Sequence, residues 1–178
     1  MSEVLIIIAI VLALAIAVVL ILAATKPDTF RIERSATINA PVDRIFAVLN
    51  DFHQWGGWSP WEHKDPALKR NFSGAERGKG AIYGWEGNKD VGTGRMEILE
   101  ANAPSKLVIK LDFFKPFEAH NTAEFTMLPQ GNATNVRWAM HGPAPFVSKL
   151  MGVFMNFDKL VGKDFEQGLA NLKQLTEK

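Results

Sequence analysis

Hydrophobic residues run without interruption near the N-terminus of the chain. Val4 to Ala24 contains no charged or polar side chain, and fifteen of its 21 residues are Leu, Ile or Val. A helix of this length is about 32 Å long, close to the hydrocarbon thickness of a bilayer. A buried core helix would carry a polar stripe, and a signal peptide would have a basic start and a shorter apolar run. Residues 4–24 are therefore predicted to form a single transmembrane anchor.

The pattern changes after a short polar linker, residues 25–29 (TKPDT). Residues 30–39 (FRIERSATIN) alternate between apolar and polar positions and are rich in β-branched residues, which predicts a strand. Residues 40–52 (APVDRIFAVLNDF) then show helical spacing, and Pro41 suits a first helical turn. A domain covering residues 30–178 thus begins with a strand followed by a helix.

Six further segments have the composition and spacing of strands, and the connections between most of them are short. Short connections favour an antiparallel meander over parallel strands, which need long crossovers. The segments are ALKRNFSG (67–74), GAIYGWEG (80–87), GTGRMEILEA (92–101), SKLVIKLDFF (105–114), EAHNTAEFTML (118–128) and TNVRWAMHG (134–142).

The chain closes with a predicted long helix, which starts in VSKLMGVFMNF (147–157) and continues through DKLVGKDFEQGLANLKQLTEK (158–178). Its apolar positions recur at steps of three and four residues, which places them on one face. Gly168 lies on that face and would allow a close approach to the sheet. The apolar positions are Phe157, Val161, Phe165, Gly168, Leu169, Leu172 and Leu175. The expected fold class is α+β, with helices on one side of a curved antiparallel sheet.

Strand alternation identifies which side chains face the helix, and this inward set is unusually rich in Met and aromatic residues. Such residues either fill an ordinary core or line a pocket for an apolar ligand, and alternation alone does not separate the two interpretations. Trp58 and Phe165 are added from outside the strands. The candidate cavity residues are Tyr83, Trp85, Met96, Phe113, Phe125, Trp138, Met140, Trp58, Phe165 and Asn121.

Two polar residues fall on the inward face. Asn121 has the same parity as Ala123 and Phe125, and a buried amide without partners costs about 1–3 kcal/mol. Asn121 is therefore a candidate to orient a ligand carbonyl or hydroxyl, although it could instead satisfy a bulge or a loop. Arg34 shares its parity with Ile32 and is placed near the mouth of the pocket.

A tryptophan-rich segment, DFHQWGGWSPWEHKDP (51–66), follows the first predicted helix. Trp55, Trp58 and Trp61 are predicted to cap one end of the domain, with at least one indole wedged into the core. The hypothesis requires burial, so it fails if all three indoles are exposed. His53 and His63 flank these tryptophans but lack the spacing of a metal site, and no metal is expected.

Composition and motifs narrow the function classes. The chain has 20 basic and 19 acidic side chains and no basic run, which argues against nucleic acid as a partner. There is no cysteine, and the sequence lacks a nucleophile elbow, an HExxH zinc motif and a phosphate loop. Among the carboxylates nearest the inward faces, alternation places most outside, so no catalytic residue and no cofactor are assigned. The residues concerned are Glu86, Asp112, Glu118 and Glu124.

Several segments together resemble the SRPBCC superfamily, whose relatives include START domains and the polyketide cyclase/dehydrase group. They are SATINAPVDRIFAVLNDFHQWGGWSPW near the start, GAIYGWEGN and VGTGRMEILEA in the middle, and DFEQGLANLK at the end. The resemblance covers residues 30–175. It implies a helix-grip fold, with about seven strands curved around the C-terminal helix and a hydrophobic ligand cavity between them. It carries over no catalytic residues, because no shared set defines the superfamily.

The expected function is that of a membrane-anchored domain that binds a small hydrophobic or lipid-like molecule. A polyketide cyclase/dehydratase-like enzyme is the alternative, and a domain with a filled cavity and a protein partner is a third interpretation. Lys26, Arg31 and Arg34 follow the apolar run, and no Lys or Arg precedes it. The positive-inside rule then favours a cytoplasmic domain, with a periplasmic or extracellular one as the alternative.

Overall fold

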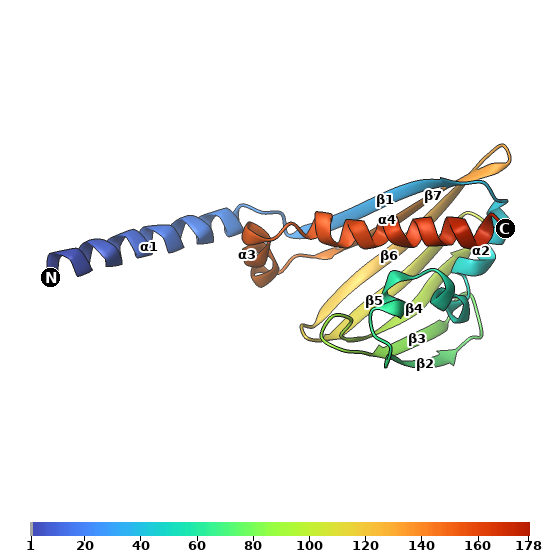
Figure 1. Ribbon diagram of the computed structural model, residues 1–178, viewed down its shortest axis with the longest axis horizontal. Coiled ribbons are helices and arrows are strands. Elements are labelled where there is room, and N and C mark those ends of the chain that lie inside the picture. The colour runs from blue at the N-terminus through green and yellow to red at the C-terminus, as the bar shows by residue number, and fades with distance from the viewer. Residues whose placement is uncertain (1) are drawn as a thin grey trace.

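A computed structural model describes residues 2–178, and it contains one curved antiparallel sheet of seven strands (Figure 1). The order across the sheet is β1-β7-β6-β5-β4-β3-β2, so β2 to β7 form a meander and β1 adds to β7. This confirms the predicted α+β helix-grip fold. The strands are β1 Thr29–Ile38, β2 Lys69–Gly74, β3 Ala81–Glu86, β4 Thr93–Asn102, β5 Lys106–Lys115, β6 Ala119–Gln130 and β7 Ala133–Pro143.

The strand register gathers the large apolar side chains on one face. In the β6–β7 pair, Phe125 lies opposite Trp138 and Ala123 lies opposite Met140. Glu124, between Ala123 and Phe125, and Arg137, next to Trp138, point to the other face, because successive side chains of a strand alternate. The concave face is therefore apolar, as the alternation predicts.

Helices close the concave face and one end of the sheet (Figure 1). The helix α2, Val42–Leu49, follows β1, and two 3₁₀ helices, Phe52–Gly57 and Pro60–His63, hold the tryptophan-rich segment. The helix α4, Phe157–Thr176, runs along the sheet and buries Phe165, Leu169 and Leu172 against it. Each such side chain contributes about 1.5–3 kcal/mol when removed from water.

The predicted single C-terminal helix is wrong in one respect, because it is broken in two. The helix α3, Phe146–Phe154, ends before Met155 and Asn156, which both have extended backbone angles. The Asn156 side chain accepts a 2.9 Å hydrogen bond from the backbone N–H of Lys159 and so caps α4. Asparagine is a favoured N-cap residue, so the break is encoded locally.

Glycine lets α4 approach the sheet at two places. A Cβ at Gly168 would lie 2.8 Å from the Trp138 ring and 3.2 Å from Pro60, so no side chain fits there. At Gly162 the same space is taken by the guanidinium of Arg34. Gly168 therefore has the role predicted from its place on the apolar stripe.

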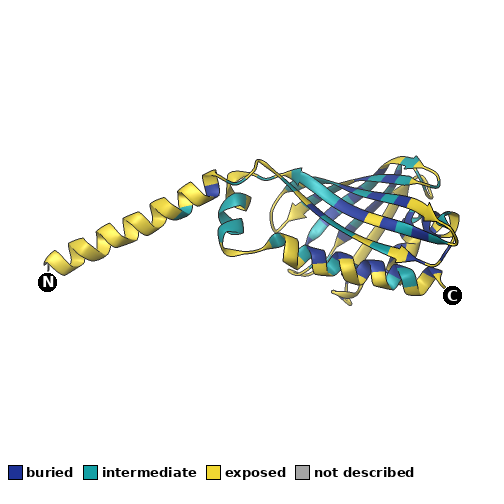
Figure 2. Cartoon of the chain, turned by 90° about the horizontal axis from the view of Figure 1, so that it is seen from above, coloured by how far each residue is buried: buried dark blue, intermediate teal, exposed yellow. Residues whose placement is uncertain are grey.

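The helix α1, Ser2–Ala24, projects away from the domain and is exposed along nearly its whole length (Figure 2). Its residues Glu3–Ala24 are long and apolar enough to cross a membrane, a property that a signal sequence shares. Ala24 is followed by four residues before β1, and α3 lies beside the C-terminal end of α1 (Figure 1).

Candidate ligand-binding site

Two adjoining spaces lie between the sheet and the helices. We call the first the inner cavity; it has a volume of about 170 Å³ and lies between the sheet, α4 and the tryptophan-rich segment. The second, the outer chamber, has a volume of about 1110 Å³ and lies between the end of the sheet nearest α1, the linker, α3 and the start of α4. Met140 and Val161 line both spaces, so these two side chains form their shared wall.

Most of the predicted cavity residues line the inner cavity, and they come from β3, β4, β5, β7 and α4. The predicted residues found in its wall are Tyr83, Trp85, Met96, Phe113, Trp138, Met140 and Phe165. Asn121 lines the outer chamber instead. Phe125 and Trp58 are fully buried in the packed core, where each lies edge-on to the other with ring centroids 6.0 Å apart.

Aromatic rings close the end of the inner cavity that lies away from α1. Trp138 stacks on Phe165 with ring centroids 4.1 Å apart and an interplanar angle of 3°. Trp61 meets both rings edge-on, at 5.7 Å and 6.1 Å. Offset and edge-on aromatic pairs contribute about 0.5–1.5 kcal/mol beyond area burial. This end is therefore firmly packed.

The tryptophan-rich segment caps this end of the domain. Trp55 and Trp58 are buried, and Trp55 and Trp61 line the inner cavity, which confirms the predicted burial. The Trp55 indole N–H donates a 3.0 Å hydrogen bond to the Leu49 carbonyl at the end of α2. Within residues 2–178, the buried indole nitrogens of Trp58 and Trp138 have no hydrogen-bond partner.

A buried carboxylate, Glu62, also lines the inner cavity, and the sequence analysis did not identify it. Its Oε1 accepts a 2.5 Å hydrogen bond from the Tyr83 hydroxyl, and its Oε2 accepts a 2.6 Å bond from Nε of Arg70. Burial, and then the hydrogen bond to Glu62, raise the pKa of Tyr83 well above its usual value. Tyr83 therefore stays protonated and acts as a donor to a carboxylate whose two oxygens are both engaged.

The sequence did not predict Glu62 as a cavity residue, because it lies in a 3₁₀ helix within an irregular segment. In such a segment neither a two-residue nor a 3.6-residue period indicates which side chains point inward. The four carboxylates considered from the strand pattern do not line the inner cavity as the structure describes it. Asp112 is nevertheless buried, where Lys110 and His120 of the polar face contact it at 2.9 Å and 2.8 Å.

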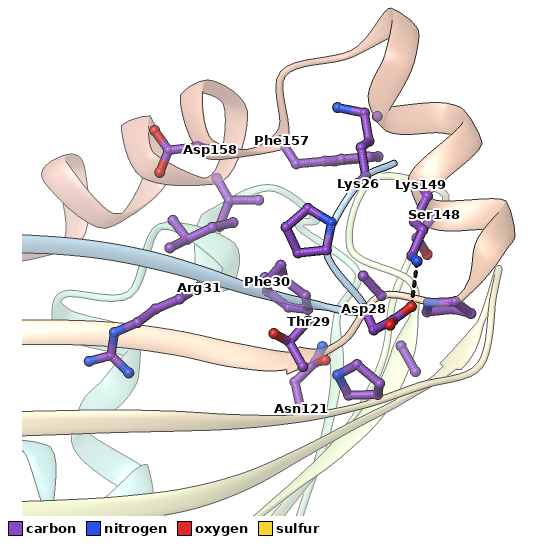
Figure 3. Close-up of a pocket in the computed structure, with 18 of the residues that line it drawn as sticks. Lys26, Asp28, Thr29, Phe30, Arg31, Asn121, Ser148, Lys149, Phe157 and Asp158 are labelled. Atoms are coloured by element: carbon purple, nitrogen blue, oxygen red, sulfur yellow. Dashed lines mark hydrogen bonds and ion pairs between the residues drawn. The ribbon is translucent and has the colours of Figure 1, made fainter. Parts of the chain in front are cut away.

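The outer chamber combines apolar and polar walls. Figure 3 shows Asn121 with Thr29 on one side of this space and Lys26 with Phe157 on the other. Asn121 is half-buried, and its Oδ1 occupies the position that a Cβ of Gly142 would take on the neighbouring strand. The predicted inward orientation of Asn121 thus places an amide in the chamber wall, where its part in recognition stays a prediction.

The linker is tied to the wall of the chamber by Asp28. Its carbonyl accepts a 2.7 Å hydrogen bond from the backbone N–H of Ala144, and its carboxylate pairs with Lys149 of α3 (Figure 3). The hydrogen bond from Lys149 lowers the pKa of Asp28. The pair holds α3 and the linker together at the side of the chamber.

Arg34 reaches from β1 to α4 rather than into either space. Its Nε donates a 2.8 Å bond to Glu166 and its Nη2 a 3.0 Å bond to Asp158. These hydrogen bonds raise the pKa of Arg34 further above its usual value, and the guanidinium lowers the pKa of Asp158. Arg34 lies close to the chamber, as Asp158 lines it, but its observed contacts fasten α4 to β1.

The fold has many known counterparts. Protein CV1439 from Chromobacterium violaceum is 14% identical, with a TM-score of 0.58, and the match covers 85% of this chain and 99% of that one. The major latex-like protein 151 of Panax ginseng is 10% identical, with a TM-score of 0.62 and coverage of 84% and 99%. The di-domain ARO/CYC BexL from the BE-7585A biosynthetic pathway is 13% identical, with a TM-score of 0.60 and coverage of 88% and 53%. At these identities the likeness establishes the fold alone.

Sequence comparison assigns the family. No curated protein shows significant similarity to the chain. The family model described as polyketide cyclase / dehydrase and lipid transport matches residues 29–177, which is nearly the whole domain beyond α1 and its linker. That range includes every wall residue of the inner cavity and the α4 helix that covers it. The chain therefore belongs to the polyketide cyclase / dehydrase and lipid transport family.

Proposed function

We propose that this protein is a membrane-anchored domain that binds a small hydrophobic or lipid-like molecule in the inner cavity and the outer chamber together. One observation carries the proposal: Met140 and Val161 belong to the walls of both spaces, so the inner cavity adjoins the outer chamber across these two apolar side chains, on the side of the domain nearest the anchor. The α1 helix supplies the anchor, because its length and composition suit a bilayer.

The sizes of the two spaces support an elongated ligand. Sites for drug-sized ligands usually have volumes of about 300–1,000 Å³. The inner cavity is below that range at about 170 Å³, whereas the outer chamber is above it at about 1110 Å³. A ligand with a slim apolar end and a bulkier remainder fits this pair better than a compact one.

The distribution of polar groups in the two walls indicates which way such a ligand would lie. The inner cavity is walled mainly by aromatic and aliphatic side chains, and its carboxylate, Glu62, is already paired. Lys26, Asn121 and Ser148 line the outer chamber. The apolar end of the ligand would thus occupy the inner cavity, and its polar group would lie near Asn121 in the chamber.

The domain is proposed to lie on the cytoplasmic side of the membrane. The support is the set of basic residues Lys26, Arg31 and Arg34 just after the apolar helix. Protease digestion of sealed vesicles tests this assignment. Cleavage of the domain in vesicles that expose their cytoplasmic face supports it, and cleavage only in vesicles of the opposite orientation contradicts it.

Mass spectrometry of the full-length protein tests ligand binding directly. The protein and two variants would be purified in detergent. The small molecules bound to each would then be extracted, and their masses and amounts compared. Met140→Trp fills the shared wall of the two spaces, whereas Leu128→Trp changes an exposed residue of β6 and is the matched control. We expect an apolar molecule with the wild type and the control and much less with Met140→Trp. A wild-type protein that carries no small molecule contradicts the proposal.

A cyclase- or dehydratase-like enzyme is the second candidate, and Glu62 is the observation that favours it. A carboxylate in a closed apolar space can serve as an acid or base. Against this, both oxygens of Glu62 are engaged by Tyr83 and Arg70, which is typical of a structural role. For a dehydratase, the molecules extracted from the wild type and from Glu62→Gln would differ by the mass of one water. Identical extracts favour binding without reaction.

A further inference from the structure

The helix α3 is apolar and only partly covered by the rest of the chain. Ser148 and Lys149 are its only polar residues, and none of its residues is buried. Val147 is 61% exposed and Phe154 is 73% exposed. Helices in proteins are stabilised mainly by the burial of an apolar face, and a helix that exposes this much apolar area to water lacks much of that stabilisation.

Further exposed apolar residues lie at the turn between β5 and β6, which borders the same chamber as α3. Phe117 in this turn is 66% exposed, and Phe114 just before it is also exposed. Phe117, Phe154 and Met155 all line the outer chamber, so they form its rim. Contiguous exposed apolar surface on a domain marks an interaction site, whereas scattered single residues are normal. We call α3, Met155 and the β5–β6 turn the rim face.

The position of the rim face indicates what covers it. It lies at the end of the domain from which α1 projects, and α3 contacts α1 (Figures 1 and 2). Only Thr25–Asp28 separate α1 from β1, and four extended residues reach roughly 14 Å at most. The hydrogen bonds that Asp28 accepts from Ala144 and Lys149 hold this linker against the start of α3. A bilayer that contains α1 would therefore lie within reach of the rim face.

Two lysines beside the rim face suit a lipid surface, and the acidic residues Asp28, Glu118 and Asp158 also line the chamber. Lys26 lies at the chamber wall, and Lys115 is exposed between Phe114 and the turn. A Lys or Arg near anionic headgroups contributes about 1 kcal/mol of attraction. Phe side chains with flanking lysines are the composition with which peripheral helices enter the headgroup region. A protein partner of matching shape has no comparable support from the position of the face.

We propose that the rim face docks on the lipid bilayer that holds α1, so that the outer chamber opens directly onto the headgroup region. The inference rests on the membrane anchor of the proposed function and names the source of the ligand: a lipid-like molecule passes between bilayer and chamber without crossing bulk water. The helix α3 acts as the boundary between the chamber and the bilayer. The family match covers residues 29–177 and does not include α1, so membership of the family does not by itself imply this arrangement.

Single-cysteine labelling tests the docking, and the absence of native cysteine makes each label unique. Full-length variants Phe117→Cys and Phe154→Cys would carry an environment-sensitive fluorophore in vesicles of phosphatidylcholine and phosphatidylglycerol, with or without spin-labelled lipids that quench it. Leu128→Cys, an exposed site near the β6–β7 hairpin far from α1, is the matched control. Leu12→Cys reports on the anchor itself. All four residues replaced are exposed, so the fold should tolerate the labels.

We expect lipid quenching at positions 117 and 154 to be at least twofold stronger than at position 128. If position 12 is quenched and positions 117 and 154 are no more quenched than 128, docking is wrong and the anchor stands. If position 12 is not quenched, the anchor fails and the docking proposal fails with it. A blue-shifted label at 117 and 154 without lipid quenching means that a protein surface, such as a second copy of the chain, covers the face, which also overturns the proposal.

Discussion

The two ends of the space between the sheet and α4 are both apolar, yet they are built in opposite ways. At the end away from α1, Trp58, Trp138 and Phe165 are buried in stacked and edge-on contacts. At the end nearest α1, Phe117 and Phe154 line a chamber of about 1110 Å³ and are largely exposed. Hydrophobic composition alone therefore does not distinguish a packed core from a binding surface. The two are distinguished by whether the apolar side chains make close contacts with the rest of the fold.

The largest expected effect is on stability, when one aromatic residue at each end is truncated to alanine. Trp58→Ala removes a fully buried side chain and should lower the free energy of unfolding by about 3–5 kcal/mol. Phe154→Ala removes an exposed one and should change it by no more than about 0.5 kcal/mol. Urea unfolding of the full-length protein in detergent, followed by circular dichroism, measures both. Equal losses would mean that the end nearest α1 is as closely packed as the opposite end.

A second test makes the same substitution in a helix of each end. Gly168→Ala should destabilise the protein by about 1–3 kcal/mol, because the added methyl meets the packed Trp138 ring at 2.8 Å. Gly152→Ala in α3 meets only the flexible Lys26 side chain, at 3.7 Å or more, and should stabilise it by up to about 1 kcal/mol through helix propensity. Thermal unfolding shows whether each substitution lowers or raises the stability of the protein. A stabilising Gly168→Ala would refute the close contact between α4 and the sheet.

A smaller effect is expected when the ion pair of Asp28 and Lys149, at the end of the domain nearest α1, is removed. The pKa of Asp28 is lowered in the folded protein, so the pair contributes above the ordinary carboxyl pKa of about 3.9 and is lost as the pH falls through the lowered value. At neutral pH, Asp28→Asn should therefore speed amide hydrogen exchange in α3 but not in α4. Asp90→Asn, in the loop before β4, is the control. Unchanged exchange in α3 would show that Asp28 does not hold it.

The smallest effect concerns His120, which lines the outer chamber and is exposed. A 2.8 Å hydrogen bond to Asp112 raises the pKa of His120 above 6.5, so its stabilisation is complete below the ordinary pKa and is lost as the pH rises through the raised one. Nuclear magnetic resonance titration should show the raised pKa in the wild type and a lower one in Asp112→Asn. An equal pKa of His120 in the wild type and in Asp112→Asn would show that Asp112 does not interact with the ring.

The fold follows from the sequence because its determinants are periodic. Alternation in the strands places Trp138 and Met140 on the inner face, and the three- and four-residue spacing of Phe165, Leu169 and Leu172 does the same for α4. The break at Asn156 is also local, but the apolar residues on both sides of it hide the capping signal. Periodic patterns were therefore sufficient for architecture and insufficient for the break.

The site was predicted only in part, because its remaining pieces come from segments without a period. Glu62 lies in a short 3₁₀ helix, and the outer chamber is assembled from the linker, the β5–β6 turn and the ends of α3 and α4. Their side chains meet through tertiary folding rather than through spacing in the sequence. Alternation likewise predicted that Phe125 is inward but could not show that it lies in the packed core rather than in the cavity wall.

The most direct test of ligand binding uses the tryptophans themselves. Four of the five, Trp55, Trp61, Trp85 and Trp138, line the inner cavity, and α1 contains none. A dibrominated fatty acid quenches an indole only on contact, so titrating it into the full-length protein in detergent reports entry into the cavity. We predict saturable quenching of most of the emission at about one fatty acid per protein. Emission no lower than with the unbrominated fatty acid, or quenching that never saturates, would contradict a ligand site between the sheet and α4.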